Sequence, residues 1–318
     1  MIRWALALFL LSMPTPPEAV PVIFDSDMNT DCDDVAALAL LHALADKGEA
    51  RIVATGASSK NEESPQCISA LNGWFGRPEL PVGAPKGPGT TEPSKYAKQI
   101  AARYDHQVKE APDAAQLYRD LLEKEADGSV VLVTVGYLTN VAALLKLPDG
   151  PEIVRRKVRV WVCMGGNFVG HPPKDDLKLG NVNFTREKAG ALEAITKWPG
   201  PLVFVGREIG SVPSGLKLGA RFKDLPEDHP VRVAYGLYFG GAPKDRHVAD
   251  LTAVLYAVRG LGDRWTLQDK GAMDLHADMT FEWRMDREGK QAYLLKKGDD
   301  RAIEREMEEL ILQGKSRR

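Results

Sequence analysis

The sequence predicts an α/β fold: an open, mostly parallel doubly wound sheet flanked by helices, with a C-terminal β-hairpin and helix as an appendage. Runs rich in Val, Leu and Ile alternate with helix-like runs along most of the 318 residues. Such runs are typical of parallel strands buried on both faces, and their alternation with helices is typical of a doubly wound sheet. The expected strands are 22–24, 51–57, 80–83, 130–135, 158–164 and 202–205. The expected helices between them are 34–45, 65–75, 114–125, 138–147 and 186–197.

The last third of the chain changes character. A helix is expected over 248–258, and two alternating runs, 279–285 and 291–296, lie on either side of Glu288-Gly289. This pattern predicts a β-hairpin, which a polar helix over 300–312 follows. We find no internal repeat and no domain-scale linker. Residues 21–318 are therefore expected to form a single domain.

The N-terminus departs from the rest of the composition. Arg3 is followed by an apolar run over 4–13, which is too short to span a bilayer, and then by a Pro-rich stretch. This pattern is typical of a signal peptide, placed at residues 1–20. We expect an exported protein, periplasmic or extracellular, with no membrane attachment after cleavage. Residues 14–19 lack a clear small-x-small pattern, which leaves open an uncleaved anchor or a chance resemblance of the first residues to a signal peptide.

The composition limits the classes of partner. A net charge of -2, with no dense Lys/Arg block, argues against nucleic acid and against an anionic membrane surface. A small-molecule ligand is expected, and self-association into a homo-oligomer stays open. The three cysteines, Cys32, Cys67 and Cys163, are odd in number and show no CxxC spacing. They are expected to be buried residues and not a disulfide framework.

A cluster of carboxylates marks the first strand-to-helix junction. Five aspartates fall within ten residues: Asp25, Asp27, Asp31, Asp33 and Asp34. So many neighbouring carboxylates cannot all stay ionised without a positive charge, and oxygen ligands select a hard divalent cation. Helix capping and the helix dipole would explain one or two of them. Five, at the carboxyl end of a strand where α/β sheets place their ligands, predict a metal or catalytic site.

Three later segments also place polar groups directly after a strand or before a helix. Gly136 follows Val135 and permits an unusual turn that exposes a main-chain carbonyl. Gly165-Gly166-Asn167 precedes a loop that reaches Asn181 and Asn183, and Asp250 opens an apolar helix. Each segment alone fits an ordinary turn or cap.

Together these residues resemble the nucleoside hydrolase family, the inosine-uridine-preferring N-ribohydrolases, and in particular a bacterial sub-branch with a longer aspartate loop. The resemblance covers about residues 22–258. It implies an open α/β fold with a tightly bound Ca²⁺ at the bottom of a ribose pocket. It also implies a glycosidase of nucleoside catabolism that cleaves the N-glycosidic bond of ribonucleosides to give a free base and ribose.

The resemblance further implies roles for individual residues. Asp27 corresponds to the general base and a calcium ligand, and Asp34 to the bidentate ligand. Val135 would supply its backbone carbonyl, and Asp250 would complete the protein ligands. Ca²⁺ takes six to eight oxygens at about 2.3–2.6 Å, which leaves places for one water and two sugar hydroxyls.

On the substrate side, the resemblance implies that Asp33 holds ribose hydroxyls and that Asn167 and Asn181 bind the ribose. Asp27 would take a proton from a water acidified by the cation, and the hydroxide would attack the anomeric carbon. The carboxylate-rich pocket would stabilise the positive charge that develops on the ribose. Direct attack by water predicts inversion at that carbon.

Three departures from the family pattern matter. Five residues, not three, separate Asp27 from the Asp33-Asp34 pair, which leaves a contact between Asp31 and the metal open. Leu179 stands where the family has a Glu, and Ala249 stands where some members have a His that protonates the leaving group. The remaining candidates for a leaving-group acid are His106, His247 and Glu208, or the protein supplies none. Base preference is not predicted.

Two alternatives remain. A haloacid-dehalogenase-like phosphatase would use Asp25-Ser26-Asp27, but Asn29 departs from the Thr or Val of that family, and the Asp33-Asp34 pair would be unexplained. The other alternative is an exported ribose- or nucleoside-binding protein without catalysis, which Leu179 and Ala249 keep open.

Overall fold

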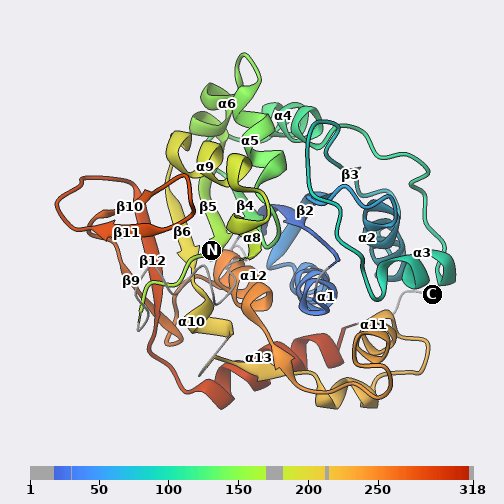
Figure 1. The fold of residues 1–318 in the computed structure, drawn as a ribbon. Coiled ribbons are helices and arrows are strands. Elements are labelled where there is room, and N and C mark those ends of the chain that lie inside the picture. The colour runs from blue at the N-terminus through green and yellow to red at the C-terminus, as the bar shows by residue number, and fades with distance from the viewer. Residues whose placement is uncertain (1–17, 30, 170–181, 212–214, 315–318) are drawn as a thin grey trace, which may run out of the picture.

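The structure is a computed structural model and describes residues 18–29, 31–169, 182–211 and 215–314. In the described part of the chain, the central sheet has eight strands in the order β3-β2-β1-β4-β5-β6-β12-β9 (Figure 1). All neighbouring strands are parallel except β9, which pairs antiparallel with β12. The predicted doubly wound sheet is thus confirmed.

The strands of the central sheet are β1 (Val20–Ser26), β2 (Ala50–Ala57), β3 (Val82–Gly83), β4 (Val130–Thr134), β5 (Val158–Met164), β6 (Leu202–Val205), β9 (Trp265–Gln268) and β12 (Gln291–Lys296). Two smaller sheets pair β7 (Lys217–Leu218) with β8 (Arg246–His247) and β10 (Ala272–Leu275) with β11 (Phe281–Arg284). The helices are α1 (Asp33–Asp46), α2 (Glu63–Trp74), α3 (Ala97–Arg103), α4 (Ala114–Lys124), α5 (Thr139–Lys146), α6 (Gly150–Lys157), α8 (Val182–Thr185), α9 (Lys188–Lys197), α10 (Arg207–Gly210), α11 (Pro230–Phe239), α12 (Ala249–Arg259), α13 (Asp300–Leu312) and the 3-10 helix η1 (Ala220–Asp224).

Successive side chains of the central strands point to opposite faces, and each face packs on its own layer of helices. Val131 and Val133 of β4 belong to the apolar core shared with α1, α2, α12 and α13, whereas Val130 and Leu132 belong to the core shared with α4, α5, α6 and α9. Figure 1 shows these two groups of helices on opposite sides of the sheet. This burial on both faces explains why the strands are almost continuously apolar.

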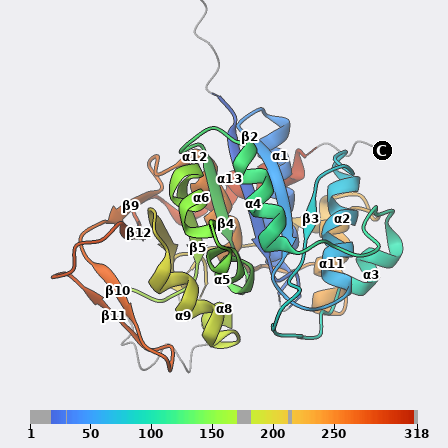
Figure 2. The same cartoon turned by 90° about the horizontal axis from the view of Figure 1, so that it is seen from above.

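The C-terminal hairpin is present, but its strands differ from those expected. Residues 281–284 pair with 272–275, not with 291–296. Residues 291–296 instead form β12, which lies between β6 and β9 in the central sheet. Figure 2 shows β10 and β11 at one edge of the molecule, opposite α2 and α3. Short alternating runs indicate strands but not their partners, so the turn residues Glu288-Gly289 suggested the wrong pairing.

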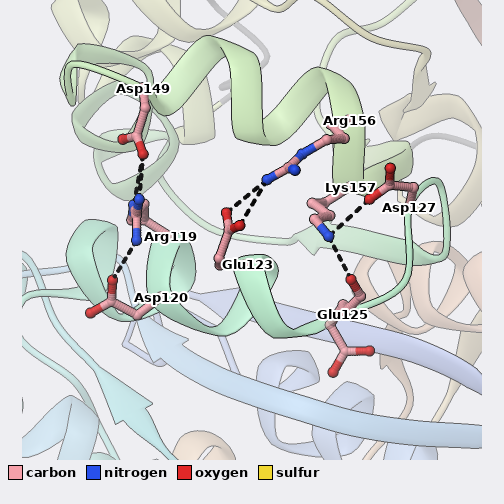
Figure 3. Close-up of polar contacts among 8 residues, drawn as sticks. All are labelled: Arg119, Asp120, Glu123, Glu125, Asp127, Asp149, Arg156 and Lys157. Atoms are coloured by element: carbon pink, nitrogen blue, oxygen red, sulfur yellow. Dashed lines mark hydrogen bonds and ion pairs between the residues drawn. The ribbon is translucent and has the colours of Figure 1, made fainter.

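Ion pairs join the outer surfaces of α4 and α6 (Figure 3). Arg119 lies 2.5 Å from Asp149, and Arg156 lies 2.8 Å from Glu123. Lys157 donates to the Glu125 carbonyl at 2.7 Å. Most of these side chains are exposed, where water and salt screen their attraction. None of the helices in the described residues has the length and hydropathy needed to cross a membrane.

We predict that stability depends on the apolar core and not on the ion pairs in Figure 3. Trp161 is fully buried and donates to Thr134 Oγ1 at 2.9 Å. Trp161→Ala should lower the free energy of unfolding by about 3–5 kcal/mol in urea titrations. Arg156→Ala should leave it nearly unchanged. Equal losses for the two variants would contradict this ranking.

Candidate metal and substrate site

A cavity of about 350 Å³ lies at the carboxyl ends of the central strands. Its wall combines acidic, basic and small side chains from segments far apart in the sequence. The residues that line it are Asp27, Asp31, Asp33, Asp34, Val135, Met164, Val182, Asn183, Arg207, Ser211, Arg246, His247, Ala249 and Asp250. This is the position where open α/β sheets bind ligands.

The loop between β1 and α1, together with the first turn of α1, supplies four of the five N-terminal aspartates to the cavity. The backbone turns at Met28, which has a left-handed φ of 48°. Ser26 Oγ donates to Asp34 Oδ1 at 2.5 Å, and the Met28 amide donates to the same oxygen at 3.3 Å. These bonds fix Asp34 in the first turn of α1, where the helix dipole favours a negative charge.

The first turn of α12 brings a further carboxylate to the same place. One carboxylate oxygen each of Asp33, Asp34 and Asp250 lies within 4.8 Å of the others. These three residues and Asp27 are all at most 6% exposed. Asp34 and Asp250 thus lie on one edge of the sheet, although they are far apart in the sequence. Such a cluster of oxygen atoms is typical of a site for a hard divalent cation.

The electrostatics of the cluster fit a bound cation. Burial and, to a smaller extent, the neighbouring charges of Asp33 and Asp31 together raise the pKa of Asp27 to about 7, against a hydrogen bond from the Asn29 backbone. Burial and neighbouring carboxylates also raise the pKa values of Asp34 and Asp250 well above their ordinary range. A positive ion at this point would relieve the repulsion and the cost of burial together. The residues present therefore fit a divalent cation.

The turn after β4 packs directly against Asp27. A Cβ atom on Gly136 would lie 2.2 Å from the Asp27 backbone nitrogen and 2.8 Å from its Cβ, so only glycine fits here. The preceding residue, Val135, lines the cavity, and its carbonyl accepts a hydrogen bond of 3.0 Å from Asn183 Nδ2. The same amide group of Asn183 donates to the Met164 carbonyl at 3.0 Å. Asn183 thus links the ends of β4 and β5.

Asp25, the first aspartate of the motif, lies outside the cavity wall. Its Oδ2 atom accepts hydrogen bonds from Tyr118 Oη at 2.5 Å and from Asn140 Nδ2 at 2.8 Å. Asn140 also donates to the Ala57 carbonyl at 2.8 Å. Burial raises the pKa of Asp25 to about 7, against the effect of these two donors. The structure therefore gives Asp25 a bracing position between β1, α4 and α5.

Asp31 has cationic partners from β8. Arg246 Nε lies 2.9 Å from Asp31 Oδ1, and His247 Nε2 lies 3.2 Å from Asp31 Oδ2. Burial alone would raise the pKa of Asp31, but these two partners hold it well below its usual range. Burial would lower the pKa of His247, but hydrogen bonds to Asp31 and Asp33 raise it to about 9.

The other residues predicted from the sequence occupy different positions. Asn167 is buried but is not among the described residues that line the cavity, and Asn181 lies outside the described residues. Of the three candidate acids, His247 lines the cavity, whereas His106 and Glu208 do not. His106 lies in the loop after α3, next to a residue that bonds to α2. Glu208 accepts a hydrogen bond of 3.2 Å from the Phe168 amide.

Several residues of the cavity wall were not predicted. The sequence assigns no role to Asn183, which lies in α8, or to Arg246, which precedes the candidate His247. Both are polar residues close in sequence to predicted site residues, and this closeness could have indicated that they belong to the site. Arg207, which begins α10, and Ser211, which follows it, gave no comparable signal in the sequence. Cys32 is fully buried, and burial raises the pKa of its thiol well above the usual range.

Known proteins share this fold. The family model for the inosine-uridine preferring nucleoside hydrolase matches residues 22–188, slightly more than half of the chain. A comparison with curated protein sequences gives no match. Among solved structures, the inosine-uridine preferring nucleoside hydrolase from Bacillus anthracis is similar, with a TM-score of 0.69 and 16% identity over 92% of this chain and 99% of that chain.

Two further solved structures show the same likeness. The purine-preferring ribonucleoside hydrolase from Gardnerella vaginalis has a TM-score of 0.69 and 17% identity over 92% of this chain and 98% of that chain. The type III effector protein XopQ, solved with adenosine diphosphate ribose, has a TM-score of 0.69 and 16% identity over 94% of this chain and 95% of that chain.

The fold and the acidic cavity define a protein of the open α/β type with a candidate metal site. The chain belongs to the inosine-uridine preferring nucleoside hydrolase family, whose members are glycosidases that act on N-glycosyl compounds. This membership confirms the family predicted from the sequence and removes the phosphatase alternative.

We predict that the metal-free protein loses stability as the pH rises from 5 to 8. Asp27 has a pKa of about 7 in the folded chain and an ordinary value of 3.8. Because folding raises this pKa, the folded state binds more protons than the unfolded state between these values. The stabilisation is fully present below pH 3.8 and is lost as the pH rises through about 7. Asp25, with a pKa of about 7, acts in the same direction.

Thermal melting in EDTA across this pH range tests the prediction, and Asp27→Asn should weaken the dependence. Added Ca²⁺ should raise the melting temperature more at pH 8 than at pH 5, because protonated carboxylates bind the ion poorly. A metal-free protein whose melting temperature rises steadily from pH 5 to 8 would contradict the electrostatics described here.

Proposed function

We propose that this protein hydrolyses the N-glycosidic bond of ribonucleosides in a calcium-dependent reaction, giving a free base and ribose. The convergence of Asp27, Asp33, Asp34 and Asp250 at one buried cavity carries this proposal. Family membership supports the reaction class. The oxygen-only donor set supports Ca²⁺ as the ion.

Asp27, Asp34 and Asp250 would hold the cation together with the Val135 carbonyl. A carbonyl oxygen has two lone pairs, so Val135 can accept from Asn183 and still face an ion. When bound, a divalent cation acidifies water and orients ribose hydroxyls. Because Ca²⁺ accepts six to eight oxygens, a water and two sugar hydroxyls would complete these ligands.

The residues of the chain divide the remaining chemistry among them. Asp27 would take the proton from the attacking water, and Asp33, whose Oδ2 lies 3.6 Å from His247 Nδ1 at the cavity wall, would accept a hydrogen bond from a ribose hydroxyl. Asn167, Asn181 and Asn183 are the proposed amide contacts to the sugar. The surrounding carboxylates would stabilise positive charge on the ribose ring as the bond to the base breaks.

His247 is the proposed donor to the leaving group. Among the three candidates it is the one whose side chain lines the cavity. Its two ring nitrogens face Asp31 at 3.2 Å and Asp33 at 3.6 Å, so the ring is held at the cavity wall. A proton donor at this point could protonate the base as it departs.

The direct test is to incubate the protein with inosine, adenosine, uridine and cytidine and to measure free ribose. We expect ribose release with calcium, loss of release in EDTA, and recovery when calcium is restored. Binding of nucleosides without any release of ribose would favour the non-catalytic binding protein instead.

We predict that Asp27→Asn lowers kcat by at least about 10² to 10⁴ while the chain stays folded, because a general base contributes a factor of this size. Steady-state kinetics measure the loss, and circular dichroism checks the fold. Near-normal hydrolysis by the folded variant would rule out Asp27 as the base.

We also predict that His247→Gln acts selectively on substrates with poor leaving groups. It should lower kcat/KM for inosine by about 10² to 10⁴ but have little effect on p-nitrophenyl riboside, whose leaving group needs no protonation. His106→Gln is the matched control outside the cavity wall and should change neither value. Equal losses on both substrates would show that His247 does not donate the proton.

A further inference from the structure

The Asp31 carboxylate lies at the cavity wall but is occupied by other groups. Arg246 donates to it from Nε, at 2.9 Å to Oδ1 and 3.0 Å to Oδ2, and from Nη2 at 2.5 Å to Oδ2. His247 Nε2 lies 3.2 Å from Oδ2, and the Cys32 amide donates to Oδ1 at 2.8 Å. A carboxylate has about four acceptor positions, so these contacts leave little capacity for a cation.

The position of the pair in the chain suggests its role. Asp31 precedes Asp33 by two residues, and Arg246 precedes Asp250 by four, although 215 positions separate Asp31 from Arg246. The pair therefore joins the segment that starts α1 to the segment that starts α12. These two helices pack together and carry Asp33, Asp34 and Asp250 in their first turns.

We propose that Asp31 and Arg246 form a clasp that positions the carboxylates of the metal site, and that Asp31 is not itself a ligand. This inference rests on the metal site of the proposed function. The carboxylates of Asp33, Asp34 and Asp250 repel one another, and that repulsion pushes the starts of α1 and α12 apart when no cation is bound. The clasp opposes this separation and keeps the oxygens close enough to bind one ion.

The geometry of the clasp is suited to holding the starts of α1 and α12 together. The contact is bidentate, and the side chains of Arg246 and Asp31 are 32% and 16% exposed, so water screens it less than a surface pair. The guanidinium group also lies 5.3 Å from the ring centroid of Tyr238 in α11. The backbone beside it is fixed by pairing of β8 with β7 and by a bond of 2.7 Å from the Val248 amide to the Gly210 carbonyl.

The same two helices carry a matched control at their other ends. Glu49, just after α1, pairs with Arg259 at the end of α12, with Nε to Oε2 at 2.7 Å and Nη2 to Oε1 at 2.8 Å. This pair is also bidentate and spans 210 positions. It joins α1 to α12 away from the carboxylates, so its loss should affect stability without changing the metal site.

The test measures calcium affinity of the full-length chain by isothermal titration calorimetry, with terbium luminescence as a second probe. Asp31→Asn and Arg246→Gln should each weaken binding by about 10- to 100-fold, the usual cost of removing a group that orients metal ligands. The double variant should bind about as weakly as either single variant, because the two residues act as one unit. Arg246→Lys should recover part of the affinity, and Glu49→Gln should leave it unchanged.

The Arg246 variant separates the clasp from the alternative in which Asp31 binds the ion. If Asp31 were a ligand, removal of Arg246 would free its carboxylate and remove a competing positive charge, and binding would tighten. Calcium affinity in Arg246→Gln that equals or exceeds that of the wild type would therefore overturn the clasp alone. A wild-type chain that binds neither calcium nor terbium would overturn the proposed metal site and the clasp with it.

Discussion

The repulsion among four buried carboxylates is the constraint on which the rest of the site depends. Asp27, Asp33, Asp34 and Asp250 are held together where water cannot screen them, which raises the pKa of each. The first turns of α1 and α12 offset part of this cost, because the amino end of a helix favours negative charge. The repulsion that the helix ends do not offset favours the binding of one cation.

The sheet makes this arrangement available. β1 lies between β2 and β4, and the register of β1 against β4 pairs Asp25 with Thr134. Val135 therefore emerges beside the aspartate loop, and Gly136 allows that loop to approach within contact distance. The catalytic chemistry we propose thus uses a loop, a turn and a helix start that the parallel strands bring to a single edge.

Sequence patterns predicted those parts of the fold and site that depend on the order of residues within a single segment. The apolar runs located β5 and β6 at their observed limits, and the aspartate motif located the acidic side of the cavity. Pairing between distant segments could not be predicted in the same way. Residues 291–296 pair in parallel with β6 in the central sheet. The alternation of apolar and polar residues within 291–296 does not indicate this partner.

The contact of Asp31 with Arg246 could not be predicted from the sequence either. The contact between Asp31 and Arg246 depends on how α1 packs against α12. The sequence pattern of residues 22–38 alone therefore could not decide whether Asp31 binds the metal. The asparagines illustrate the same limit at short range. Asn181 and Asn183 are two positions apart in the sequence, and only the folded chain shows that the side chain of Asn183, in α8, lies against Val135 and Met164.

The most direct measurement is X-ray diffraction from crystals of the protein grown with calcium. We predict one ion with carboxylate oxygens of Asp27, Asp34 and Asp250 and the Val135 carbonyl at about 2.3–2.6 Å, while Asp31 keeps its contact with Arg246. Asp31, Asp33 and His247 form the other group of side chains in the described residues whose atoms lie close enough to hold a metal. An ion bound there, or no ion among the carboxylates at saturating calcium, would contradict the proposed metal site.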